Sequence, residues 1–138
     1  MAGYSNTPLI KKLGIKEGFT MAFVNPPEHF SDELGSLPAD AILTTRRTQR
    51  LDFAIVFALK EKTLKREFER VARKLLPNGM LWVAWPKKSS GVSTDLSFAN
   101  VQKIGLAAGL VDVKICAIND VWSGLKFVYR VRDRHQVS

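Results

Sequence analysis

Two short polar segments hold most of the side chains in this sequence that could bind a ligand. The first follows an apolar run and carries Trp85, Lys87, Lys88, Ser89 and Ser90. Ammonium groups, hydroxyls and accessible backbone N–H groups suit an anionic group such as phosphate or carboxylate. The Gly-x-x-x-x-Gly-Lys pattern is absent here, so a nucleoside triphosphate is not implied. The alternative is a solvated loop that carries a helix cap.

The second segment contains Asp120, Trp122 and Ser123. If the strand that starts at Trp122 runs antiparallel beside the strand that precedes Lys87, both segments lie at one edge of the sheet. We therefore expect one site, in which cations, hydroxyls and aromatic rings hold a planar or anionic ligand. The alternative is a structural ion pair of Asp120 with Lys87 or Lys88, with tryptophans that only cover the core.

The remaining reactive side chains do not indicate a catalytic or metal-binding site. Cys116 has alternating apolar neighbours and no histidine close in sequence, which predicts a buried, inert thiol. One cysteine excludes an internal disulfide, and the two histidines, His29 and His135, lie far from any ligand pattern. We predict no metal site and no catalytic residue.

Apolar runs and amphipathic stretches alternate along the chain. The expected strands are residues 19–24, 41–45, 52–59, 80–85, 111–118 and 122–131. The expected helices are residues 7–14, a short stretch ending at 35, residues 64–76 stopped by 77–79, and residues 94–109 capped by Ser93 or Thr94. This order predicts an α/β fold with a mostly parallel sheet and a C-terminal antiparallel hairpin. The 138 residues are expected to form a single three-layer domain (core 7–131, short basic tail 132–138).

The periodicity also predicts the core. Residues expected to be mainly buried are Ile55, Phe57, Phe68, Val71, Leu75, Val83, Phe127 and Tyr129.

The order of elements resembles the second half of a Rossmann-like, S-adenosylmethionine-dependent methyltransferase. The resemblance rests on the order of the predicted elements. An apolar strand that opens at Asp52 is followed by a helix, by Pro77-Asn78-Gly79, by a second apolar strand, by another helix and by a terminal hairpin. The resemblance implies the fold, in a truncated form, for residues 7–131. At least one strand–helix unit is expected to be missing between Thr45 and Asp52.

The segment after the first strand departs from that family. A glycine-rich turn is expected there, but Asn25, Pro26, Pro27 and Glu28 occupy it. Residues 44–47 (Thr-Thr-Arg-Arg) stand where an acidic residue would bind the ribose. The Asn-Pro-Pro-Glu sequence resembles the Asn-Pro-Pro-aromatic motif of amino-group methyltransferases, but Glu28 cannot stack on a base, so a rigid turn is the interpretation adopted.

Two short segments resemble sequences of a family of small bacterial proteins whose function is not established. They are residues 85–91 and 120–126, together with the start at residues 3–5. This resemblance implies a bacterial source.

The composition gives a net charge of +8, from 21 Lys and Arg against 13 Asp and Glu. The charge permits nucleic-acid binding but does not require it. The cations considered for it are Arg46, Arg47, Arg50, Arg130, Arg132 and Arg134. Because no aromatic residue interleaves the first cluster, nucleic acid is not the favoured partner.

The sequence therefore favours a non-catalytic domain, without a cofactor, that binds a small anionic ligand or a protein partner at the carboxyl edge of its sheet. The first alternative is a minimal methyltransferase that holds S-adenosylmethionine beside Asn25, Glu28 and Asp52. The second is a nucleic-acid-binding module. No apolar run reaches the roughly 20 residues of a membrane span, so we expect a cytoplasmic protein with no membrane partner.

Overall fold

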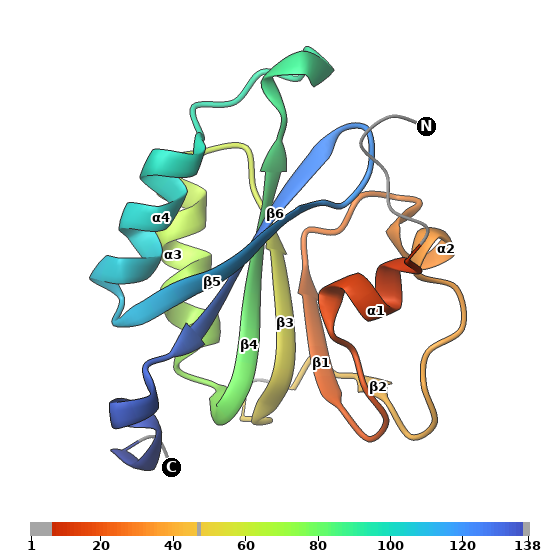
Figure 1. Cartoon of the computed structure of the whole chain (residues 1–138), viewed down its shortest axis with the longest axis vertical. Coiled ribbons are helices and arrows are strands. Elements are labelled where there is room, and N and C mark those ends of the chain that lie inside the picture. Colours follow the sequence, from red (N-terminus) through yellow and green to blue (C-terminus); the bar gives the residue numbers. More distant parts are fainter. Residues whose placement is uncertain (1–6, 47, 137–138) are drawn as a thin grey trace.

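A computed structural model describes residues 7–46 and 48–136 of the chain. Its core is one six-stranded sheet in the order β2-β1-β3-β4-β6-β5 (Figure 1). The strands are β1 (Thr20–Val24), β2 (Ile42–Leu43), β3 (Leu51–Phe57), β4 (Leu75–Pro86), β5 (Leu110–Ala117) and β6 (Trp122–Tyr129). β1 to β4 pair in parallel, and β6 runs antiparallel to both β4 and β5. The predicted α/β fold with a C-terminal antiparallel hairpin is confirmed.

Helices cover both faces of this sheet. They are α1 (Leu9–Leu13), α2 (Phe30–Leu34), α3 (Glu61–Ala72) and α4 (Phe98–Ala107), with 3₁₀ turns η1 (Lys88–Ser90) and η2 (Val131–Gln136). α1 and α2 pack on one face and α3 and α4 on the other (Figure 1). None of the helices in the described part of the chain is long and apolar enough to cross a membrane.

Each face has its own apolar core, because side chains alternate between the faces along each strand. On the α3 and α4 face, Phe68 and Phe127 meet edge to face with ring centres 5.2 Å apart. On the α1 and α2 face, the Nε1 of buried Trp82 donates a hydrogen bond of 2.9 Å to the Leu13 carbonyl, which fixes α1 against β4.

The predicted core is confirmed for seven of its eight residues. The buried ones are Ile55, Phe57, Phe68, Val71, Leu75, Val83 and Phe127. Tyr129 is only partly buried, and its hydroxyl donates to the Ala72 carbonyl at 2.6 Å.

The expected end of the third helix is wrong. α3 stops at Ala72, and Leu75 already belongs to β4, where it pairs with Leu51. Residues 77–79 lie within β4 rather than at a helix stop, because the pairing with β3 shifts register between Leu51 and Phe53 and so accommodates them. Periodicity alone could not separate the last helical leucine from the first residues of a buried strand.

The expected cap of the last helix is also wrong. The Oγ of Ser97 accepts a hydrogen bond from the Asn100 backbone N–H, and the Asn100 side chain accepts one from the Ser97 backbone N–H. This reciprocal pair is a capping box and starts α4 at Phe98. Thr94 instead donates through its hydroxyl to the Leu59 carbonyl at 2.6 Å.

The chain takes a short route from β2 to β3. No helix or strand occurs among the described residues between Leu43 and Leu51, in agreement with the missing strand–helix unit expected there. This direct crossing leaves the α3 side of β1 without a helix of its own.

Candidate functional site at the carboxyl edge of the sheet

A pocket of about 470 Å³ opens where β1 and β3 end side by side. From β1 the chain continues to β2 on one side, and from β3 it continues to β4 on the other. The pocket therefore lies at the topological switch point, the usual place for a ligand in an open α/β sheet. Its lining residues are Asn25, Pro27, Phe57, Ala58, Leu59, Lys60, Thr63, Val92 and Trp122. We call it the switch-point pocket.

Aromatic side chains form one wall of the switch-point pocket. The rings of Phe57 and Trp122 meet edge to face at 5.1 Å, and Phe30 packs on Phe57 at 4.9 Å. Because Phe57 and Phe30 are buried, this wall is held rigidly by the core behind it. A rigid aromatic wall suits a planar ring or a cationic group.

The turn after β1 forms the opposite wall. Asn25 has a left-handed backbone with φ of 54°, which asparagine tolerates better than most residues. Pro26 and Pro27 follow it and have no backbone N–H. The turn therefore offers the Asn25 side chain but few backbone donors.

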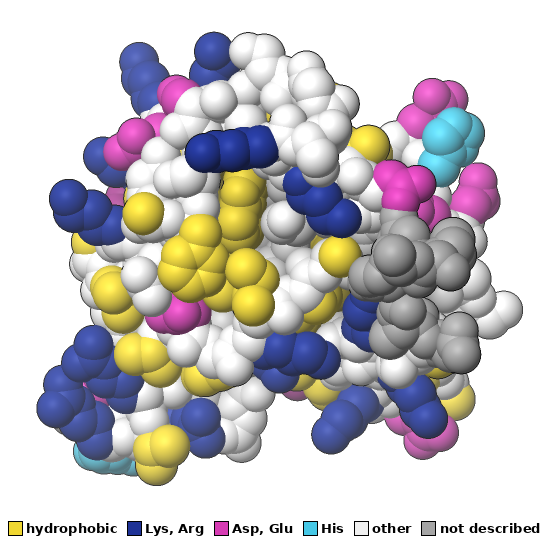
Figure 2. Space-filling model, turned by 45° about the horizontal axis from the view of Figure 1, so that its top comes forward, with side chains coloured by type: hydrophobic (Ala, Val, Ile, Leu, Met, Phe, Trp, Pro, Cys, Tyr) yellow, Lys and Arg dark blue, Asp and Glu magenta, His cyan; other side chains and the backbone are white. Residues whose placement is uncertain are grey.

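A second pocket, of about 510 Å³, lies on the α4 face of the same edge. It is lined by Trp85, Pro86, Lys87, Lys88, Leu96, Ser97, Phe98, Ala99, Ile115 and Ser123. Figure 2 shows apolar side chains gathered near the middle of the visible face, with Lys and Arg side chains around them. We call this second pocket the α4-side pocket.

The α4-side pocket brings part of the predicted ligand site together. Trp85 pairs with Ser123 across β4 and β6, and the Lys87 backbone N–H donates to the Val121 carbonyl at 2.8 Å. Ser90 is occupied locally, because its hydroxyl donates to the Lys87 carbonyl at 2.7 Å and accepts from the Val92 N–H at 3.1 Å.

Ser90 does not line this pocket, and three other residues of the predicted site also lie apart from it. Trp122 points to the α1 and α2 face, into the switch-point pocket. Ser89 and Asp120 are exposed, and Asp120 forms no ion pair with either lysine within the described residues. The two segments lie at the same edge of the sheet, as expected from the topology, but their tryptophan side chains lie on opposite faces of the sheet.

The three residues considered for a cofactor are not brought together. Asn25 lines the switch-point pocket, and Glu28 is exposed in the turn beyond it. Asp52 lies near the start of β3, at the other end of the sheet, where its carboxylate accepts a hydrogen bond of 2.8 Å from the Thr20 N–H. Asp52 therefore fixes the start of β1 beside β3.

Cys116 packs against the core on the α1 and α2 face and is half-buried. Burial raises the pKa of its thiol, and the nearby charges of Lys12 and Lys114 offset this only in part. The pKa direction agrees with an unreactive thiol at neutral pH.

Comparison with solved structures identifies the fold. A SAM-dependent methyltransferase from Aquifex aeolicus is 15% identical, with a TM-score of 0.57 over 86% of each chain. Magnesium protoporphyrin IX methyltransferase from Synechocystis PCC 6803, with bound SAH, is 10% identical, with a TM-score of 0.55 over 88% of this chain and 78% of that one. The DhpI–SAH complex is 9% identical, with a TM-score of 0.62 over 91% and 83%. The chain thus has a truncated, Rossmann-like methyltransferase fold.

The comparisons by sequence give no further relative: no family model and no curated protein matches the chain. The structural neighbours nevertheless contradict the expectation of a non-catalytic domain without a cofactor. They include methyltransferases, and several are complexes with S-adenosylmethionine or S-adenosylhomocysteine.

The sequence interpretation missed the residues after β3. Leu59, Lys60 and Thr63 line the switch-point pocket. The available signal was the carboxyl end of the strand at residues 52–59, since ligands in such sheets bind beyond strand ends.

Proposed function

We propose that this chain is a minimal S-adenosylmethionine-dependent methyltransferase whose cofactor binds in the switch-point pocket. The observation that carries the proposal is the position of this pocket, at the switch point of a fold whose solved neighbours include complexes with S-adenosylmethionine and S-adenosylhomocysteine. We also propose that the 138 residues form one domain, with its core at residues 7–131. The bacterial source and cytoplasmic location stay predictions.

The pocket fits the cofactor in size and in most of its lining. Its volume of about 470 Å³ lies within the range of small-molecule sites. The partly exposed Trp122 ring, with Phe57 buried behind it, can stack on adenine or face the sulfonium cation. Lys60 offers a cation for the amino-acid carboxylate, and Asn25 and Thr63 offer hydrogen bonds.

The turn after β1 fits the cofactor less well. Without glycine, and with two prolines in succession, it cannot cradle the ligand with backbone N–H groups. The β2 end carries Thr44 and Thr45 rather than a carboxylate for the ribose hydroxyls. We therefore propose that side chains, more than backbone, hold the cofactor here.

When bound, S-adenosylmethionine supplies an electrophilic methyl group on sulfur. The chain's part is to orient the donor and the acceptor and to keep water from the reacting atoms. Phe57 and Trp122 exclude water from the inner wall, while Leu59 and Val92, both partly exposed, border the mouth of the pocket.

The test is isothermal titration of the protein with S-adenosylmethionine and with S-adenosylhomocysteine. We expect micromolar binding, and an absence of heat at millimolar cofactor would refute the proposal. Lys60→Met should weaken binding by roughly tenfold, the loss of one charged hydrogen bond. Lys62→Met, two residues away and outside the pocket, is the matched control and should bind as the unaltered protein does.

A further inference from the structure

A groove of about 380 Å³ runs along the α3 side of β1, where the short crossing from β2 to β3 leaves the strand uncovered. Ala22 and Val24 form part of its floor, and Thr44 and Thr45 lie on one wall. Arg66, Glu67, Arg70 and Lys74 line the other wall. We call this the β1 groove.

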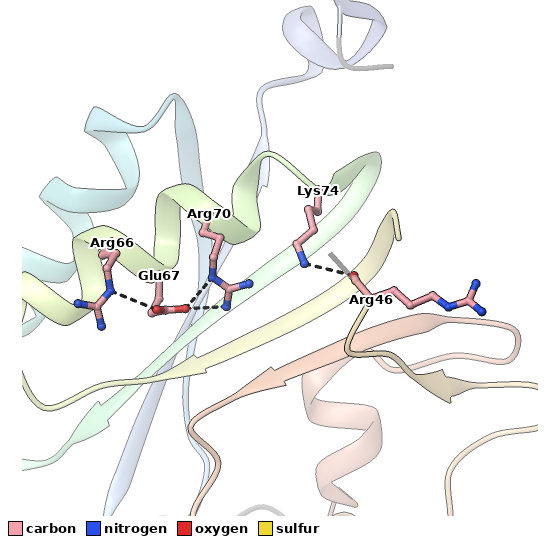
Figure 3. Close-up of polar contacts among 5 residues, drawn as sticks. All are labelled: Arg46, Arg66, Glu67, Arg70 and Lys74. Carbon is pink, nitrogen blue, oxygen red and sulfur yellow. Dashed lines mark hydrogen bonds and ion pairs between the residues drawn. The ribbon is translucent and has the colours of Figure 1, made fainter. Parts of the chain in front are cut away.

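The positive charges of the β1 groove are regularly spaced. Arg66 and Arg70 lie on one side of α3, roughly 6 Å apart along its axis, and Lys74 follows four residues later in the turn after the helix. Arg46 lies across from them, and its carbonyl accepts a hydrogen bond of 3.5 Å from the Lys74 Nζ. Figure 3 shows the Arg46 guanidinium extending away from Lys74.

A single carboxylate holds two of these arginines in place. Glu67 accepts hydrogen bonds from the Arg70 Nε and Nη2 at 2.9 and 2.6 Å, and from the Arg66 Nε at 3.3 Å (Figure 3). Partial burial favours the neutral acid, but Arg70 and then Arg66 outweigh it and lower the pKa of Glu67. Glu67 is therefore ionised at neutral pH and orders the guanidinium groups.

The groove keeps a strong surplus of positive charge. Three cations, Arg66, Arg70 and Lys74, face one carboxylate, and Arg66 contacts Glu67 through its Nε, which leaves its terminal nitrogens available to another acceptor. Guanidinium groups bind phosphate oxygens in a two-pronged geometry. A regular row of cations matches a regular row of phosphates better than the irregular carboxylates of an acidic peptide.

From this arrangement we propose that the β1 groove binds the sugar–phosphate backbone of a single-stranded nucleic acid. The one aromatic residue among the described lining residues is Phe23, and its ring packs against Phe30 and Phe53 on the opposite face of the sheet, so bases are not read by stacking in the groove. Binding is accordingly independent of base sequence and strongly dependent on salt. The inference does not depend on methyl transfer.

The test is fluorescence anisotropy of a labelled 12-nucleotide single-stranded RNA of mixed sequence, titrated from low to moderate salt. Three phosphate contacts should give a slope of about 2 for log Kd against log salt. Arg66→Gln with Arg70→Gln removes both guanidinium groups from the α3 wall of the groove, and should weaken binding about tenfold and reduce the slope by roughly 1.4. Glu67→Gln should tighten binding, because it removes the negative charge of the groove.

The matched control is Lys62→Gln with Lys103→Gln, which removes two exposed charges outside the groove. If this control weakens RNA binding as much as the groove variant does, the attraction belongs to the whole protein and the proposal is wrong. If poly-glutamate of equal charge competes as well as unlabelled RNA, the groove recognises acidic peptides and the proposal is equally wrong. Circular dichroism of each variant checks that the fold is retained.

Discussion

Trp85 and Trp122 lie on opposite faces of the sheet, although the strands that carry them pair directly. Trp85 pairs with Ser123, and Trp122 pairs with Pro86 one position further along. Because side chains alternate along a strand, this one-residue offset sends Trp85 toward α4 and Trp122 toward Phe57. The carboxyl edge therefore has two separate pockets, of which only the switch-point pocket contains Trp122.

The separation of the two tryptophans predicts different effects on cofactor binding. Trp122→Leu removes an aromatic wall of the switch-point pocket and should weaken S-adenosylhomocysteine binding by roughly 1 kcal/mol or more. Trp85→Leu alters the opposite core and should lower the thermal midpoint with little change in cofactor affinity. Titration calorimetry below both midpoints measures the two effects. Equal loss of affinity in both variants would contradict the assignment of the pocket.

The sequence predicted the fold well where a pattern extends over a whole element. The strand around Ile55, the helix around Phe68 and the antiparallel order of the last hairpin are confirmed. Element ends were predicted poorly where two patterns meet, as at Leu75, which satisfies both a helical stripe and a buried strand. Phe127 of β6 is buried as expected, whereas the strand expected at residues 122–131 ends at Tyr129.

The candidate site was harder to predict from the sequence than the fold. The topology that brings Lys87 close to Trp122 followed from the expected strand order, and the backbone contact from Lys87 to Val121 agrees with it. The face of the sheet on which each tryptophan lies depends on the register between two strands, because a shift of one residue moves a side chain to the opposite face. The β1 groove was not predicted, because it results from a missing element and from charges on α3 that a helical pattern alone assigns to a solvated face.

Gly105 is predicted to be essential for packing α4 against the sheet. A Cβ atom at this position would overlap the ring of Phe127, which is already held edge to face by Phe68. Replacing glycine by alanine inside a helix gains about 1 kcal/mol of propensity, whereas overpacking a rigid core costs about 1–3 kcal/mol and occasionally more.

Because the added Cβ would overlap the Phe127 ring outright, the packing cost lies in the upper part of that range. We therefore expect Gly105→Ala to be destabilising by roughly 1–2 kcal/mol in net terms. Urea denaturation measures the change in the free energy of unfolding. Lys103→Ala, exposed on the same helix, should change it little. A Gly105→Ala variant as stable as the unaltered protein would show that the two layers are more loosely packed than the structure indicates.

The Tyr129 hydroxyl should contribute to stability in a pH-dependent way. It donates to the Ala72 carbonyl at the end of α3, and Tyr129→Phe should cost about 1 kcal/mol at neutral pH. Burial raises the pKa of Tyr129, and the nearby Arg50 offsets this only in part. A raised pKa means that the contribution is complete below the unfolded pKa of about 10 and is lost as the pH rises through the folded value. The difference in the free energy of unfolding between the two proteins, measured from denaturation curves, should therefore shrink as the pH rises above about 10, and a difference that stays constant over the alkaline range would contradict this.

Lys126 is predicted to destabilise the fold at neutral pH. It lies in β6 on the α1 side, with its Nζ near Gly14, and it shares this surface with Lys16 and Lys114. Burial, followed by the charges of Lys114 and Lys16, lowers the pKa of Lys126. The folded protein therefore binds this proton less tightly than the unfolded chain does.

The sign of the pH dependence follows from that difference. Between the folded pKa and the unfolded value of about 10.4, the unfolded state holds more protons, so stability rises with pH in this range. Lys126→Met keeps the apolar stem and removes the charge. The variant should be more stable than the unaltered protein at pH 7. The gain should be less than about 1 kcal/mol, because the ammonium is partly exposed and screened. It should shrink as the pH approaches 10. Lys103→Met, at an exposed position of α4, should show no such trend. A Lys126→Met variant that is less stable than the unaltered protein at pH 7 would contradict the prediction, because the ammonium would then make favourable contacts that outweigh the cost of its burial.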